Sequence, residues 1–120
     1  MTETQNPKRY DLEERTFKFA KRVRMLVSKL PKTIPNMEDG KQAVRSSGSI
    51  GANYIEANEA LSKKDFLMRI KICRKEAKET NYWINLFDIN NTELENERKS
   101  LAKEAIELTN IFGSIIRKSE

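Results

Sequence analysis

Carboxylates are the residues of this chain whose spacing comes closest to a catalytic pattern. Glu56, Glu76 and Glu79 fall in stretches with a helical hydrophobic period. Carboxylates that converge inside a helical bundle can bind a pair of metal ions, but such sites also use histidines in Glu-x-x-His pairs. The chain contains no histidine. The sequence therefore argues against a metal centre at these glutamates.

Candidate nucleophiles also lack the partners they would need. Ser46, Ser47 and Ser49 have only lysines or carboxylates as potential bases, because histidine, the usual base, is absent. The single Cys73 can form neither an intramolecular disulfide nor a Cys/His zinc site in one chain. The glycines around Ser49 do not match a phosphate-binding loop. We therefore predict a protein that is not an enzyme and has no cofactor and no bound metal.

Four helices are predicted to position these residues. The first extends from an N-cap at Asp11 to Lys29 or Leu30, because Pro31 disfavours helical backbone in the residue before it. Its expected apolar stripe is Phe17, Ala20, Val23, Met25, Leu26, Val27 and Leu30.

The second helix is predicted from about Asn36 to about Ala60. Glycines and serines between Arg45 and Asn53 should destabilise its middle by roughly 0.5–1 kcal/mol per residue relative to alanine. Close approach of another helix is the simplest compensation. The expected inward face is Ala43, Val44, Ser47, Gly48, Ile50, Gly51, Tyr54 and Ile55.

Heptad-like spacing defines the third and fourth helices. Ser62 or Asp65 is expected to cap the third helix, and Thr92 with Glu95 matches a capping box for the fourth. The third seam is Phe66, Ile70, Cys73, Ala77, Thr80, Ile84 and Phe87. The fourth is Leu94, Arg98, Leu101, Ala105, Leu108, Phe112 and Ile115.

These elements predict an all-α protein, an antiparallel up-down-up-down four-helix bundle. Residues 1–10 are expected to form a flexible tail and residues 11–118 a single domain. Apolar residues outside the seams favour a homo-oligomer, with a broad core-facing stripe in a monomer as the alternative. There is no apolar segment long enough to cross a bilayer and no secretory signal, so we expect a cytoplasmic protein without membrane association.

Positive charge is concentrated on two segments. Residues 8–32 carry nine Lys/Arg against three acids, and residues 63–78 carry seven against two. Such segregation can attract a polyanion or serve pairing between basic and acidic helices. The predicted nucleic-acid-binding residues are Arg15, Lys18, Lys21, Arg22, Lys71, Arg74, Lys75 and Lys78.

A polar stripe follows one face of the second helix. It contains Arg45, Ser49, Asn53 and Glu56, spaced 4, 4 and 3 apart. An antiparallel neighbour could bring Glu76 or Glu79 to Arg45, and such a pair would fix the register of the two helices. The alternative is a solvated face of ordinary charges.

The stretch from Gln42 to Ala57 resembles the signature of the S23, or 23S rRNA-intervening-sequence, proteins. Its matching residues are Arg45, Ser49, Ile50, Ala52, Asn53 and Glu56. Lys64-x-Phe66, the region of Glu76 and Glu79, and the Leu30-Pro31 helix end fit the same family. The resemblance covers most of residues 10–118, and Ala57 departs from it where glycine is more usual.

This resemblance implies a left-handed antiparallel bundle, commonly assembled as a homopentamer. It also implies kinship with the accessory variability determinant of diversity-generating retroelements, a basic ring that associates with a reverse transcriptase and nucleic acid. Two functions stay open: binding of RNA or DNA led by charge and shape without strong sequence preference, or a structural scaffold for a protein partner.

Overall fold

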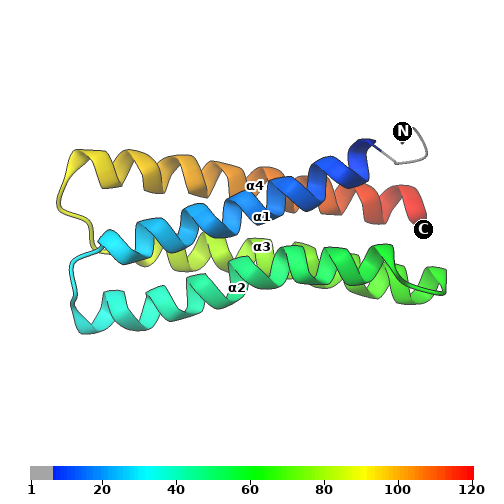
Figure 1. Cartoon of the computed structure of the whole chain (residues 1–120), viewed down its shortest axis with the longest axis horizontal. Coiled ribbons are helices and arrows are strands. Elements are labelled where there is room, and N and C mark those ends of the chain that lie inside the picture. The colour runs from blue at the N-terminus through cyan, green and yellow to red at the C-terminus, as the bar shows by residue number, and fades with distance from the viewer. Residues whose placement is uncertain (1–6) are drawn as a thin grey trace.

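Four helices make up the described part of the chain (Figure 1). The computed structural model describes residues 7–120, with the side chains of residues 11–120. The helices are α1 (Pro7–Lys29), α2 (Ile34–Asn58), α3 (Lys63–Leu86) and α4 (Thr92–Ser119). Each lies against the next, α4 returns to α1, and the start of α1 lies at the same end of the bundle as the end of α4. No strand occurs within this part of the chain, so the predicted all-α up-down-up-down bundle is confirmed.

Side-chain oxygens set the starts of three helices. Thr33 accepts the backbone N–H of Asn36 at the start of α2, and Ser62 caps α3 as predicted. The capping box predicted for α4 is wrong by one residue. Asn91 is the N-cap and accepts the N–H of Leu94 at 2.8 Å, and asparagine is at least as good a cap as threonine.

The start of α1 differs from the prediction. The helix begins at Pro7, so Asp11 is an interior residue and not the N-cap. Proline suits a first helical turn because its fixed φ matches the helix and its missing N–H would have had no partner there. Residues 1–6 of the predicted tail lie outside the described residues.

The core follows the predicted seams closely on α3 and α4. Their buried residues include Ile70, Cys73, Ala77, Thr80, Ile84, Leu101, Ala105, Leu108 and Phe112. Ile116 is buried and Ile115 only partly so.

The predicted stripes of α1 and α2 need correction. Phe17 is 65% exposed and Met25 57% exposed, while Phe19 is buried. Phe19 lies 4 and 7 residues before Val23 and Leu26, which is the spacing of one helical face. On α2, Ile55 is 51% exposed and Ser46 is fully buried.

Two glycines of α2 allow α1 to approach closely. A Cβ at Gly51 would lie 2.9 Å from Thr16 Oγ1, and one at Gly40 would lie 2.8 Å from Val27 Cγ1. Gly48 meets only the guanidinium of Arg24. The predicted compensation by a neighbouring helix is therefore confirmed at Gly51, whereas Gly48 accommodates a side chain.

Asn36 ties two connectors together at one end of the bundle. Its Nδ2 donates to the carbonyls of Pro31 and Asp88 at 3.0 Å each, and its Oδ1 accepts the N–H of Asp88 at 2.9 Å. The side chain is buried, so these bonds replace the water that it would otherwise bind.

Candidate nucleic-acid interface

The basic stripe of α1 faces the acidic side of α4. Arg15 donates to both carboxylate oxygens of Glu104, at 2.6 and 2.9 Å, and to Glu107 at 2.8 Å. Arg22 donates to Glu97 at 3.1 and 3.2 Å and to Ser100 at 2.8 Å. The hydrogen bond to Glu104 raises the pKa of Arg15 above its ordinary value.

Most of the predicted binding residues of α1 are paired with carboxylates. Arg15 and Arg22 are engaged within the bundle, and Lys18 pairs with Glu14 at 3.3 Å. Lys21 is exposed, and of the four predicted binding residues of α1 it alone forms no ion pair with a described side chain. The basic segment of α1 thus serves pairing with an acidic helix, one of the two uses its composition predicted.

The basic stripe of α3 is free of such pairing over most of its length. Lys71, Lys75 and Lys78 are exposed, and Arg74 is half-buried. Of these four residues, only Lys71 has a carboxylate within 4 Å among the described side chains, that of Glu120 at 3.9 Å. The four residues recur every three or four positions, so they form one face of α3.

Cations of α4 that sequence reasoning missed lie beside this stripe. A Cβ built on Gly113 would lie 3.9 Å from Arg74 Cδ and 3.4 Å from Arg117 Nη1, so Arg74 and Arg117 meet over the same glycine. Lys99 and Lys103 line a shallow pocket of about 650 Å³ further along the α3/α4 face. The spacing of Gly113 and Arg117 by one helical turn is visible in the sequence, but the proximity of Arg74 to them is not.

The acids responsible for the net acidity of residues 92–107 are mostly engaged elsewhere. Glu97, Glu104 and Glu107 point to α1, and Glu95 pairs with Arg98, which lowers the pKa of Glu95. Glu95 and Glu107 also line the pocket that contains Lys99 and Lys103, so the surface there carries both charges.

Arg98 explains why a charged residue interrupts the apolar seam of α4. Its Nη1 donates to the carbonyl of Phe87 at 2.6 Å and reaches those of Ile84 and Asn85 at 3.4 Å. These carbonyls lie at the end of α3, where the last residues of a helix have few backbone partners, although that of Ile84 also accepts the N–H of Phe87 at 3.3 Å. Arg98 thus caps one helix from the next.

The predicted register pair between α2 and α3 forms. Arg45 Nη2 lies 3.6 Å from the carboxylates of both Glu76 and Glu79. Glu76 is buried, and its Oε1 accepts no hydrogen bond within the described part of the chain. Arg45 is therefore the counter-charge of a buried carboxylate, which is the structural role predicted for this stripe.

The rest of the polar stripe makes a second link to α3. Asn53 donates to the carbonyl and hydroxyl oxygens of Ser49, at 2.9 and 3.0 Å, and accepts from Arg69 Nη1 at 2.9 Å. Glu56 is exposed and does not join either group. The stripe therefore orients α2 against α3 through Asn53 and Arg45.

The serine and cysteine candidates are packing residues. Ser46 shares a 2.7 Å hydrogen bond with Thr80, and both side chains are fully buried. Cys73 contacts the carbonyl of Ile50, and burial raises the pKa of its thiol to about 12. At neutral pH this thiol is protonated and a poor nucleophile.

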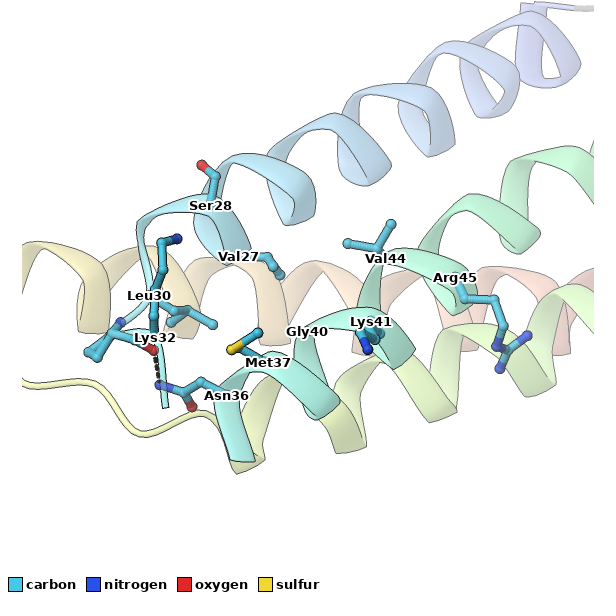
Figure 2. A pocket seen from close by; sticks show the side chains of 11 residues that line it. Val27, Ser28, Leu30, Lys32, Asn36, Met37, Gly40, Lys41, Val44 and Arg45 are labelled. Carbon is cyan, nitrogen blue, oxygen red and sulfur yellow. Dashed lines mark hydrogen bonds between the residues drawn. The ribbon is translucent and has the colours of Figure 1, made fainter. Parts of the chain in front are cut away.

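An apolar groove lies between the end of α1 and the start of α2 (Figure 2). Its volume is about 490 Å³. Figure 2 shows Val27 on the α1 side facing Met37 and Val44 of α2, with Lys32 and Lys41 at the rim. Met37 is 53% exposed, so the groove presents apolar surface to solvent.

Two kinds of feature are absent from the described residues. No group of three or more Cys, Asp or Glu side chains there is arranged to hold a metal ion. None of the helices combines the length and apolar character needed to span a bilayer.

Comparison with known proteins gives a family and a solved structure. The family model described as 23S rRNA-intervening sequence protein matches residues 8–114. A crystal structure of a protein of unknown function from the S23 ribosomal protein family of Bacteroides thetaiotaomicron is 31% identical. It has a TM-score of 0.77, and the match covers 92% of this chain and 98% of that one. No curated protein matches.

Proposed function

The chain belongs to the 23S rRNA-intervening sequence protein family, and we propose that it is a non-enzymatic protein that binds nucleic acid through the outer face of α3. The binding is led by charge and shape, because the stripe offers cations without a base-reading motif. RNA and DNA share the phosphate backbone that such a surface would contact.

One observation carries the proposal. Of the two basic stripes, that of α1 is largely paired with carboxylates, whereas Arg74, Lys75 and Lys78 of α3 have none within 4 Å among the described side chains. Cations without a partner in the folded chain are available to neutralise phosphates, and their counterions are released on binding.

Charge reversal of the stripe tests the proposal. The variant K71E/R74E/K75E/K78E should lose retention of a single-stranded RNA in a gel shift at low salt. The matched control K29E/K32E/K41E/K63E makes the same change in net charge on exposed lysines outside the predicted binding residues. It should retain RNA, because the effect depends on location.

Two results would contradict the proposal. Unchanged retention by the α3 variant would exclude the stripe, and equal loss in both variants would show a response to net charge alone. Circular dichroism of both variants would establish that the helices are intact.

The proposal includes assembly into a homo-oligomer, with five copies as the family resemblance implies. Large apolar side chains exposed on the described surface support it, among them Phe17, Ile55 and Met68. Exposed apolar area of this kind is commonly covered by a partner. A ring would also repeat the α3 stripe and multiply the phosphate contacts.

A second candidate function is a scaffold that binds a protein partner, such as the reverse transcriptase that the resemblance implies. The groove of Figure 2 favours it, since Val27, Met37 and Val44 offer a partly exposed apolar surface with a basic rim. This candidate predicts that the unmodified protein does not retain RNA.

A further inference from the structure

Gly113 differs from the other glycines of the bundle because arginine side chains from two helices lie over it, whereas Gly48 meets an arginine of one helix only. It is buried in the interior of α4, where glycine costs roughly 1 kcal/mol relative to alanine. A Cβ at this position would lie 3.4 Å from Arg117 Nη1 and 3.9 Å from Arg74 Cδ. The side chains of Arg117 on α4 and Arg74 on α3 therefore both lie against this glycine.

These two arginines are also the ones without an acceptor. Arg15, Arg22, Arg45 and Arg98 pair with carboxylates, Arg69 donates to Asn53, and Arg24 donates to the carbonyl of Ala20. Among the described arginines, only Arg74 and Arg117 have neither a hydrogen-bond acceptor nor a carboxylate within 4 Å. Arg74 is nevertheless half-buried.

Two guanidinium groups whose side chains lie against the same glycine, and neither of which is paired with a carboxylate, repel each other. A bound anion attracts both guanidinium groups and offsets this repulsion, since each can donate two parallel hydrogen bonds to phosphate oxygens. Lys71 and Lys78 lie within about one turn of Arg74 on the same face of α3. They extend the positive surface in both directions along the helix.

We propose that Arg74 of α3 and Arg117 of α4 form a two-arginine phosphate site over Gly113. This inference rests on the proposed function for the source of the phosphate, which is the backbone of a bound nucleic acid. The site fixes where one phosphate sits, and the lysines of α3 then contact its neighbours.

The first experiment measures binding of a fluorescein-labelled twelve-residue oligouridylate by anisotropy at 50 mM and 200 mM NaCl. R74Q and R117Q should each weaken binding roughly five- to tenfold and reduce the salt slope by about one. The matched control is R24Q, because Arg24 Nη2 lies 3.3 Å from a Cβ built on Gly48 without a second arginine beside it. Binding by R24Q should stay within about twofold of the unmodified protein. If R74Q and R117Q bind as tightly as R24Q, the two-arginine site is excluded even though RNA binds.

A second readout separates this inference from the proposed function. Inorganic pyrophosphate, added to protein with ¹⁵N-labelled arginine, should shift the Nε–Hε signals of Arg74 and Arg117 and leave that of Arg24 unchanged. Such shifts without RNA binding would support the phosphate site and refute nucleic acid as its source. Equal small shifts of all arginines would overturn the site.

Discussion

Buried polar side chains link separate segments of this bundle by hydrogen bonds, and Asn36 is the clearest case. It joins the connector after α1 to the connector after α3 through three hydrogen bonds. Arg98 acts in a similar way at the same connector, where it binds carbonyls at the end of α3. Neither role follows from residue type, because each depends on two chain segments meeting in space.

We predict that Asn36→Ala lowers the free energy of unfolding by about 2 kcal/mol, because three net hydrogen bonds of roughly 0.5–1.5 kcal/mol each are lost and two backbone groups lose their partner. Urea denaturation followed by circular dichroism measures the change. Asn90→Ala, on the exposed part of the same α3–α4 connector, is the control and should change stability by less than about 0.5 kcal/mol. Equal effects at the two positions would contradict the role of Asn36.

At the scale of helices, the α1–α4 contact differs from the others. It carries the ion pairs of Arg15 and Arg22 with carboxylates of α4, and the side chains of Arg15 and Glu104 remain 29% and 20% exposed. A bidentate, partly buried pair contributes more than an exposed one, but it is still sensitive to salt.

A double-mutant cycle on Arg15→Gln and Glu104→Gln should give a coupling energy of about 1 kcal/mol at low salt, reduced in 1 M NaCl. The exposed pair of Glu14 and Lys18 within α1 serves as reference and should give about 0.3 kcal/mol. A coupling for Arg15 and Glu104 no larger than this reference would mean that the α1–α4 pairing adds nothing beyond a surface contact.

Helix existence, order and most of the core on α3 and α4 could be predicted because hydrophobic period and capping are local properties. Every predicted seam residue from Ile70 to Ile84 is buried, and the buried residue that the seam did not include is Glu76. The wrong predictions concern positions where two neighbouring residues suit the same role equally well. Asn91 and Thr92 are both good caps, and Phe17 and Phe19 are both apolar, so only packing against other helices selects between them.

At the scale of the whole molecule, the distribution of exposed apolar residues supports the proposed oligomer. Phe17 of α1 and Ile55 of α2 are 65% and 51% exposed.

The variant F17E/I55E should therefore shift the mass measured by light scattering to that of one chain, 14.0 kDa, with unchanged helical content. Q42E adds a charge at an exposed polar position of α2 and should leave the mass unaltered. A single-chain mass for the unmodified protein would refute the oligomer.

The amino-acid sequence by itself determined four helices, their order, the family and the position of the basic segments, because these depend on spacing along the chain. The tertiary structure decided which of those charges are satisfied. Arg15 and Glu104 are 89 residues apart, and the side chain of Arg74 on α3 lies against Gly113 of α4, as does that of Arg117. Electrostatic neutralisation depends on distance in space, so the separation of paired α1 cations from unpaired α3 cations required the packed bundle.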